Sequence, residues 1–508
     1  MTDISRKNFL GFIAAAGVVA ASPVLAASPR VPAAARQKRN ILIRGADLLT
    51  MDRKAGDLPA TDVLIRGGRI AAIGKNLPAG SAEIVDGADH ILMPGMVDGH
   101  RHVWEALEMG EVTSIRQAGP TKTGYETWKF KTMVCYTPDD AHFAEYLGGL
   151  QAIESGVTGV VDYCHIFHTP QLAEGAARGL IDSGITGTFC YQVSHTPSYG
   201  KGDTVSIHQA RADRLAIPDE QHWLAAENLR RNVFNDSDLL KFGLATSNAH
   251  YGNRLFADFV QEFERLRRFN PHIITQHYSR KTPFPGPDYV RDMHQYSKAG
   301  LLGPDYLISH GNGIPEDELA LLAAAKSMIS ASPMGEIRYP EPAVHARARR
   351  AGVPIGISTD APLAMTQDYF DYVRSTYFHL FRTAEDSKIA RTYGSDDVLH
   401  FATGDGTASI RLGDEMGRVA VGQRADLLLL RTDRLGFSKA GTLSDRVVNF
   451  AKTQDIDSVW INGVARKRGG KMLGVNWAKL NSEREVRAAR LAREAATVTL
   501  VGDAGGGE

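Results

Sequence analysis

The feature that most constrains the fold is a repeated alternation of apolar strands and helical stretches between residues 91 and 412. Such alternation is typical of parallel β/α units. Eight such units close a (β/α)8 TIM-type barrel, in which the chemistry lies at the carboxyl ends of the strands. A doubly wound sheet shares part of this pattern, but it would not gather His and Asp at the ends of so many strands. The eight strands are predicted at residues 91–97, 157–163, 185–191, 239–246, 272–277, 306–310, 327–331 and 353–359.

The end of the first of these strands carries a close group of polar residues. Asp98, His100 and His102 follow it, and side chains two residues apart in a strand point to the same side. Two imidazoles on one side make half of a metal site, although a pair of histidines at a strand–loop junction is also common without a metal. The metal reading is favoured because later strands end in His277, His310 and Asp360.

Composition narrows the function classes further. The chain has 508 residues, a formal net charge of zero, 43% hydrophobic and 23% charged residues, so it is long enough for more than one folded domain. The absence of a basic surplus argues against a nucleic-acid partner and leaves a small molecule as the expected substrate. Three cysteines, Cys135, Cys164 and Cys190, do not form a disulfide framework in a chain of this length.

The first 26 residues are predicted to be an export signal. An apolar run with small residues before a cleavage point after Ala26 is typical of a signal peptide, and it is too short to span a bilayer as a stable helix. Ser5-Arg6-Lys7 resembles a twin-arginine signal with Lys in place of the second Arg. We therefore expect a periplasmic protein whose mature form has no integral membrane span, with Sec export or a retained anchor as alternatives.

Two stretches resemble the amidohydrolase superfamily, in particular the branch of cytosine, guanine and methylthioadenosine deaminases and triazine hydrolases. One is ILMPGMVDGHRHVW at residues 91–104, and the other is the segment after Leu412 with Gly417, Gly422 and Asp426. The resemblance covers about residues 39–470. It implies a metal-dependent barrel at 93–411 and a small composite β-sandwich domain built from 39–92 and 412–470. Residues 471–508 are predicted to form a C-terminal helix and a disordered tail.

The resemblance also implies a metal site and its chemistry. The implied ligands are His100, His102, His277 and Asp360, with His310 beside the metal to polarise substrate or water. Asp360 would take the proton from a water that the metal activates. The donor set suits Zn²⁺, with Fe²⁺ or Mn²⁺ as alternatives.

The number of metal ions and the assembly are implied in the same way. Relatives with two metals bridge them with a modified Lys at the end of the fourth strand, whereas Lys241 here lies at that strand's start. One metal ion is therefore expected. The resemblance also makes a homo-oligomer plausible.

The chain departs from the family pattern after the fifth strand. Ring deaminases of this branch place Glu three residues after the His, where this chain has Arg280. Arg280 either binds an anionic group of the substrate or points into solvent. Glu336, after the seventh strand, either supplies the missing acid or is an exposed loop residue. Three further candidates for substrate binding, which packing or capping would also explain, are Trp104, His165 and His250.

These observations predict a metal-dependent hydrolase that attacks a C–N bond of a small cyclic or aromatic amide, amidine or amine. Triazine hydrolases of the same branch displace chloride, so hydrolysis of a C–Cl bond is the enzymatic alternative. A non-catalytic small-molecule-binding protein on the same scaffold is the third possibility. The retained His and Asp residues argue against that third reading.

Overall fold

The computed structural model describes residues 38–112, 124–166, 168–236, 238–248, 255–278, 292–337, 341–381 and 384–502. The predicted export signal lies outside these residues. So do two of the predicted substrate-binding residues, Arg280 and His250.

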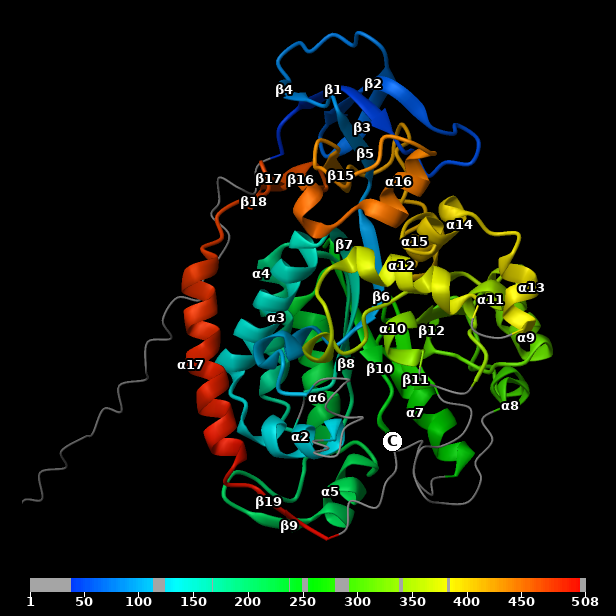
Figure 1. Ribbon diagram of the computed structural model, residues 1–508. Helices are drawn as coiled ribbons and strands as arrows, with labels where there is room; N and C mark the ends of the chain where they lie inside the picture. The colour runs from blue at the N-terminus through cyan, green and yellow to red at the C-terminus, as the bar shows by residue number, and fades with distance from the viewer. Residues whose placement is uncertain are drawn as a thin grey trace, which may run out of the picture. The chain divides into compact units, whose positions relative to one another are not determined.

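Eight parallel strands form the barrel, which confirms the predicted fold class (Figure 1). Their order in the sheet is β14-β13-β12-β11-β10-β8-β7-β6. The two edge strands meet at one bridge between Arg101 and Asp360, where the Asp360 N–H donates to the His100 carbonyl at 2.9 Å. The strands are β6 (Met96–Arg101), β7 (Val157–Cys164), β8 (Thr186–Gln192), β10 (Leu240–Ala245), β11 (Ile274–Tyr278), β12 (Tyr306–His310), β13 (Met328–Ala331) and β14 (Ile355–Ile357).

Helices between the strands pack on the outside of the barrel and complete a continuous buried core. The local sequence sets their ends. For example, a Thr137–Asp140 capping box starts α3, and Gly184 ends α4 in a left-handed conformation. The main helices are α3 (Pro138–Glu154), α4 (Leu172–Ser183), α7 (Phe256–Arg268), α8 (Met293–Lys298), α9 (Glu316–Ala325), α11 (His345–Ala351), α12 (Tyr369–His379), α14 (Ser395–His400) and α15 (Gly404–Ser409).

The first predicted strand, 91–97, is two strands in the structure. β5 (His90–Pro94) belongs to a second sheet, and β6 begins the barrel after Gly95. A side chain at Gly95 would collide with Thr158 of β7, so the chain passes between the two sheets at a point that only glycine fits. The sequence predicted that His100 follows the strand. In the structure His100 lies inside β6.

The second sheet joins segments from both ends of the described chain, as predicted. β5 pairs in parallel with β1 and antiparallel with β15, so residues more than 330 positions apart share one ladder. A small separate core lies on this sheet around Trp460. Its strands are β1 (Ile41–Leu48), β2 (Leu58–Arg66), β3 (Arg69–Gly74), β4 (Glu83–Asp86), β5, β15 (Leu427–Arg431), β16 (Ile456–Ile461), β17 (Val464–Arg468) and β18 (Lys471–Met472).

The C-terminal segment packs along elements near the barrel mouth. α17 (Trp477–Ala495) contacts η2 (Val103–Glu108) and α2 (Tyr125–Thr132), and Arg487 and Arg490 pair with the buried Asp140. The tail predicted to be disordered begins with a strand, because β19 (Thr499–Val501) pairs with β9 (Thr204–Ser206). β9 belongs to the segment after β8, which continues through α5 (Ile207–Arg214) and α6 (Glu220–Asn228). Within the described ranges, no helix combines the length and the apolar character needed to cross a membrane.

Candidate active site

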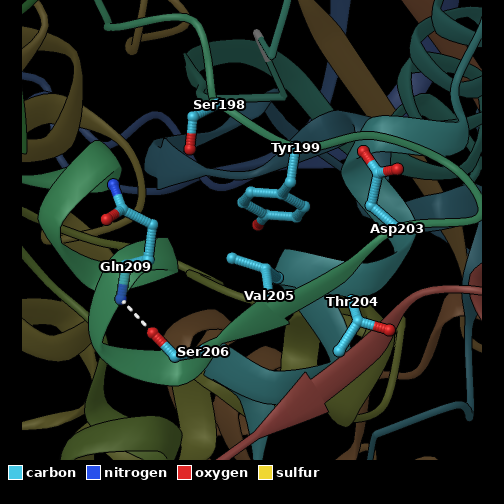
Figure 2. Close-up of a pocket in the computed structure, with 7 residues that line it drawn as sticks. All are labelled: Ser198, Tyr199, Asp203, Thr204, Val205, Ser206 and Gln209. Atoms are coloured by element: carbon cyan, nitrogen blue, oxygen red, sulfur yellow. Dashed lines mark hydrogen bonds between the residues drawn. The ribbon is translucent and has the colours of Figure 1, made fainter.

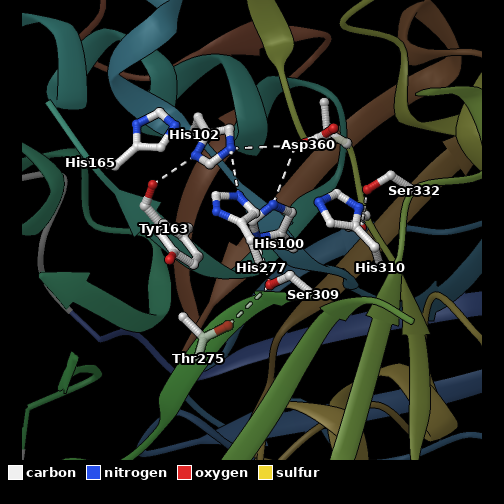
Figure 3. A network of polar contacts seen from close by, with 12 residues as sticks. His100, His102, Tyr163, His165, Thr275, His277, Ser309, His310, Ser332 and Asp360 are labelled. Atoms are coloured by element: carbon white, nitrogen blue, oxygen red, sulfur yellow. Dashed lines mark hydrogen bonds and ion pairs between the residues drawn. The ribbon is translucent and has the colours of Figure 1, made fainter. Parts of the chain in front are cut away.

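The two histidines of the H-x-H motif point their Nε2 atoms into the mouth of the barrel (Figure 3). His102 Nδ1 lies 2.8 Å from the Tyr163 carbonyl oxygen, so this nitrogen carries the proton and Nε2 keeps a free lone pair. His100 Nδ1 lies 2.9 Å from the Ser309 hydroxyl, which is 3.0 Å from the Thr275 hydroxyl. Such partners behind an imidazole fix its ring orientation, as metal-ligating histidines require.

Three later strands bring their polar ends to the same place. Asp360 Oδ1 lies 3.2 Å from His100 Nε2 and 3.3 Å from His102 Nε2. His277 Nε2 lies 3.3 Å from His102 Nε2. Donor atoms of His100, His277, His310 and Asp360 all lie within 4.8 Å of one another. The structure therefore gathers all five predicted residues at one end of the barrel.

His310 and Asp360 hold unusual backbone conformations at this site. Their φ angles are 80° and 67°, in the left-handed region that side chains other than glycine seldom adopt. Such strain persists where surrounding contacts impose it, and it concentrates at functional sites. The Asp360 side chain is 24% exposed while that of His100 is fully buried, so the site opens toward solvent on the Asp360 side.

This donor set fits a divalent metal ion. His100 Nε2 is buried and makes no hydrogen bond to any residue the structure describes. Burial lowers the pKa of His100 to about 3 and also lowers the pKa of His102 and His277, which favours the neutral imidazoles that bind metals. Burial alone would raise the pKa of Asp360, but His310, His100 and His102 hold it well below its usual range. The compact four-donor group contains His310, whereas the sequence had placed His310 only beside the metal.

Glu336 is buried against His310 rather than exposed. Only 1% of the residue is accessible, so the exposed-loop alternative is wrong. Its carboxylate lies 2.8 Å from His310 Nδ1 and accepts hydrogen bonds from the Asn312 amide and the Ser332 N–H, each at 2.7 Å. Burial opposes ionisation, but these three donors together lower the pKa of Glu336. Glu336 is therefore held as an anion with its charge directed at His310.

Trp104 contacts His165, and His165 packs on His102. The Trp104 indole is fully buried and donates its N–H to His165 Nδ1 at 3.0 Å. The His165 ring lies flat on the His102 ring, with centroids 3.9 Å apart and planes 14° apart. Packing is therefore the observed role of Trp104, and His165 contacts a candidate metal ligand.

Two residues of the site have contacts that the sequence did not predict. Tyr163 of β7 stacks on His277, with ring centroids 4.0 Å apart. Asp98 is fully buried and accepts hydrogen bonds from the Thr359 N–H at 3.0 Å and the Thr359 hydroxyl at 2.5 Å. The sequence placed Asp98 beside the H-x-H motif, but only the fold shows that it binds the residue before Asp360.

Two other polar clusters lie apart from these histidines. Cys164, Glu145 and Asp162 form a fully buried group, where burial raises the pKa of the Cys164 thiol well above its usual value and so disfavours the nucleophilic thiolate. A surface hollow near β9 contains no histidine or cysteine (Figure 2). Its lining residues are Ser198, Tyr199, Asp203, Thr204, Val205, Ser206 and Gln209.

Fold and site together define a barrel hydrolase with a histidine- and aspartate-rich centre at the carboxyl ends of its strands. Residues 292–465 match the model of the Amidohydrolase family. The chain belongs to the amidohydrolase superfamily and is a hydrolase of the class that acts on carbon–nitrogen bonds.

Curated relatives align with nearly the whole chain at low identity. The 5'-deoxyadenosine deaminase of Methanosarcina barkeri is 22% identical over 89% of this chain and 98% of its own length. The 5-methylthioadenosine/S-adenosylhomocysteine deaminase of Pyrococcus furiosus is 23% identical over 83% of this chain and 94% of its own length.

Solved structures share the fold. An adenosine deaminase from Xanthomonas campestris with bound zinc superposes with a TM-score of 0.71 at 18% identity, covering 90% of this chain and 99% of that one. A mutant atrazine chlorohydrolase from Arthrobacter aurescens, complexed with zinc and atraton, gives a TM-score of 0.72 at 17% identity, with 89% and 100% covered.

Proposed function

We propose that this chain is a metal-dependent deaminase that replaces the exocyclic amine of an adenine-type nucleoside by oxygen. The observation that supports this most is the convergence of His100, His277, His310 and Asp360 donor atoms within 4.8 Å at the mouth of the barrel. His102 Nε2 reaches the same group, because it lies 3.3 Å from both His277 Nε2 and Asp360 Oδ1. The named activities of the two curated relatives point to adenine nucleosides as the substrate class. We further propose zinc as the ion, because imidazole and carboxylate donors suit it.

His100, His102, His277 and Asp360 would hold the ion, which would lower the pKa of a water toward about 7. Asp360 is the general base in this proposal. Its carboxylate is ionised, lies between two imidazoles and reaches the open side of the site. It accepts a proton from the attacking water and returns that proton to the departing amine, so that the amine leaves as ammonia.

His310 and Glu336 act as a pair in this proposal. The carboxylate of Glu336 holds the proton on His310 Nδ1, which directs the other ring nitrogen toward Asp360. Glu336 is therefore assigned to positioning of His310 and not to protonation of substrate, because its two oxygens already accept from three donors.

Hydrolysis of a carbon–chlorine bond is the second candidate. The arginine at position 280 motivates it, because the ring deaminases that this chain resembles place there a Glu that protonates a ring nitrogen, and this chain lacks that Glu. The structural likeness to a chlorohydrolase is consistent with this alternative but shows the fold alone.

The test is an activity panel on the metal-loaded protein. 5'-Deoxyadenosine, methylthioadenosine and adenosine are assayed for released ammonia, and chlorotriazines for released chloride. We expect ammonia from at least one nucleoside. Release of chloride alone would favour the second candidate, and no release from any substrate would refute both.

Asp360→Asn tests the general base. Asparagine tolerates the left-handed backbone at this position and keeps the backbone hydrogen bonds that join β6 to residue 360. We expect kcat to fall at least about 100-fold. Unchanged turnover by a variant that still carries metal would show that another group takes the proton.

We also propose that residues 1–26 direct export to the periplasm. N-terminal sequencing of protein recovered from a periplasmic fraction should begin at Ala27. An intact N-terminus in the cytoplasmic fraction would contradict this proposal.

A further inference from the structure

A group of three polar side chains lies between strand β7 and helix α3, on the side of the strand away from the histidines. Side chains alternate along a strand, and Tyr163 of β7 faces the barrel interior, where its ring stacks on His277. Its neighbours Asp162 and Cys164 therefore face outward, toward α3, which packs on the outside of the barrel (Figure 1). Glu145 on the buried side of α3 meets them there, and the Cys164 thiol donates to Glu145 Oε1 at 3.1 Å.

The donor atoms of these three side chains are as close together as the ligands of one ion. One donor atom from each residue, a sulfur or a carboxylate oxygen, lies within 4.8 Å of the other two. Ligands that share a zinc ion at about 2.0–2.3 Å lie at most about 4.6 Å apart. All three residues are fully buried, so water does not separate the donors.

Two carboxylate oxygens of this group meet no hydrogen-bond donor. Glu145 Oε1 accepts from the thiol, and Asp162 Oδ1 accepts from the Val103 N–H at 3.1 Å. Glu145 Oε2 and Asp162 Oδ2 are buried and have no hydrogen-bond partner among the residues that the structure describes. A buried acceptor without a partner is costly, so these two oxygens are suited either to a cation or to one proton that both carboxyl groups share.

The charges around the group favour the cation. Glu145 and Asp162 repel each other, and Arg101 is a cation whose charge acts on both. Arg101 also pairs with a third buried carboxylate, because its Nη1 lies 3.4 Å from Asp98 Oδ2. Three ionised carboxylates beside one guanidinium leave an excess of negative charge that a divalent ion would cancel.

Lys129 of α2 does not change this balance. Its charge acts on Cys164, but it acts also on Glu105, a further buried acid. One cation and one acid therefore enter the count together, and the excess of acids around Glu145 and Asp162 stays.

We propose that Glu145, Asp162 and Cys164 bind a divalent metal ion at a second site, on the outer face of β7 and separate from the histidine centre. Zn²⁺ fits this donor set, because thiolates and carboxylates are among its ordinary ligands, whereas Mg²⁺ and Ca²⁺ prefer oxygen donors alone. A carboxylate can supply one oxygen or two, so three residues can complete the four donors typical of a structural zinc site. The Cys164 S–H proton is released to solvent on binding, since the thiolate is the ligand.

An ion at this site would hold β7 at the point where the strand supports His102. The Tyr163 carbonyl, between Asp162 and Cys164 in the chain, lies 2.8 Å from His102 Nδ1. Asp162 also accepts from the N–H of Val103, the residue after His102. The second site is therefore structural, because it joins α3 to β7 behind the histidine centre and contacts no substrate.

The test uses Co²⁺, which occupies zinc sites and reports a thiolate ligand through a charge-transfer band in the near ultraviolet. The histidine centre contains no sulfur donor, so this band distinguishes the second site from the first. The full chain is produced in medium that contains cobalt in place of zinc, because the three ligands are buried and the ion is expected to enter during folding.

Cobalt per chain and the near-ultraviolet spectrum are measured for the unmodified protein, Cys164→Ser, Glu145→Gln and a matched control. The control is Cys135→Ser, which makes the same change at another buried cysteine. The Cys135 thiol donates to the Lys131 carbonyl at 3.4 Å and belongs to neither group of metal-suited side chains among the described residues.

We expect the charge-transfer band in the unmodified protein and in Cys135→Ser. Cys164→Ser should lose the band, and both Cys164→Ser and Glu145→Gln should hold about one cobalt ion fewer per chain than the unmodified protein.

Absence of the band from the unmodified protein overturns the proposal, and a proton shared by Glu145 and Asp162 then explains the two oxygens. A band that persists in Cys164→Ser, or that disappears in Cys135→Ser, overturns it as well. The spectrum of the unmodified protein is decisive even if a variant does not fold. Because no turnover is measured, the outcome does not depend on the proposed deaminase function.

Discussion

At the scale of single residues, Asp98 shows how the site depends on contacts outside the set of candidate ligands. Its carboxylate accepts hydrogen bonds from both the N–H and the hydroxyl of Thr359. The Nη1 atom of Arg101 lies 3.4 Å from its Oδ2. Because Thr359 precedes Asp360, this contact fixes the strained backbone from which the Asp360 carboxylate projects. Asp98 therefore supports a candidate ligand from the same strand that carries His100.

We predict that Asp98→Asn weakens zinc binding about 10- to 100-fold, as loss of a partner behind a ligand typically does. The amide keeps the shape but is neutral, so the buried pair with Arg101 is lost, and its NH2 group can bind the Thr359 hydroxyl only as a donor. Competition with a chromogenic chelator measures the affinity. Asp89→Asn, at an exposed position, is the control, and this variant should bind zinc with the affinity of the unmodified protein. Equal affinities would show that Asp98 has no influence on the site.

The sequence could identify the candidate ligands but not their surroundings. His277, His310 and Asp360 could be predicted to lie together because each stands at or just after the end of an apolar strand, and a barrel brings strand ends together. Contacts such as Asp98 with Thr359 join residues 261 positions apart and have no local signal. Glu336 ends the short helix α10 (Pro333–Glu336) after β13, and its burial there was not predictable from periodicity.

At the scale of secondary-structure elements, the barrel depends on close strand contacts that only glycine permits. Gly187 of β8 has a φ of 119°, and a Cβ there would collide with the backbone carbonyl of Val160 in the neighbouring strand β7. Backbone atoms in a paired strand cannot move aside as a flexible side chain can.

We predict that Gly187→Ala prevents accumulation of folded protein or costs about 3 kcal/mol or more, which lowers the thermal midpoint by about 3 °C or more in a chain of 508 residues. Gly394→Ala is the control, because no atom lies within 4 Å of the added Cβ and its φ is –104°. Its cost should stay within about 1 kcal/mol. Thermal denaturation followed by circular dichroism compares the two, and similar midpoints would contradict the collision.

The apolar run 91–97 was predicted as one strand, but the structure divides it between β5 and β6. Strands β5 and β6 are both almost fully buried, so their apolar residues form one continuous run without alternation. Only Pro94-Gly95 marked the change of sheet, and the same dipeptide also fits a strand with a kink. The number of barrel strands was predictable, whereas the sheet to which each half of this run belongs required the three-dimensional pairing.

At the scale of the whole molecule, buried acids make the stability of the fold depend on pH. Glu108 is 2% exposed, and burial raises its pKa to about 8 from the ordinary 4.5. Between these two values the folded chain keeps a proton that the unfolded chain releases. The free energy of unfolding therefore falls as the pH rises through this window, by at most about 1.4 kcal/mol per pH unit from this one group.

Glu108→Gln should remove this dependence, because the amide oxygen still accepts from the Tyr136 hydroxyl at every pH. We predict thermal midpoints close to those of the unmodified protein at pH 5, and a higher midpoint for the variant at pH 8. Glu485→Gln, at an exposed position on α17, should show no such divergence between the two pH values. If the midpoint of Glu108→Gln differed from that of the unmodified protein by the same amount at pH 5 and pH 8, Glu108 would have the same protonation state in the folded and unfolded chains. The buried Tyr136–Glu108 contact would then have to stabilise a carboxylate rather than a neutral acid.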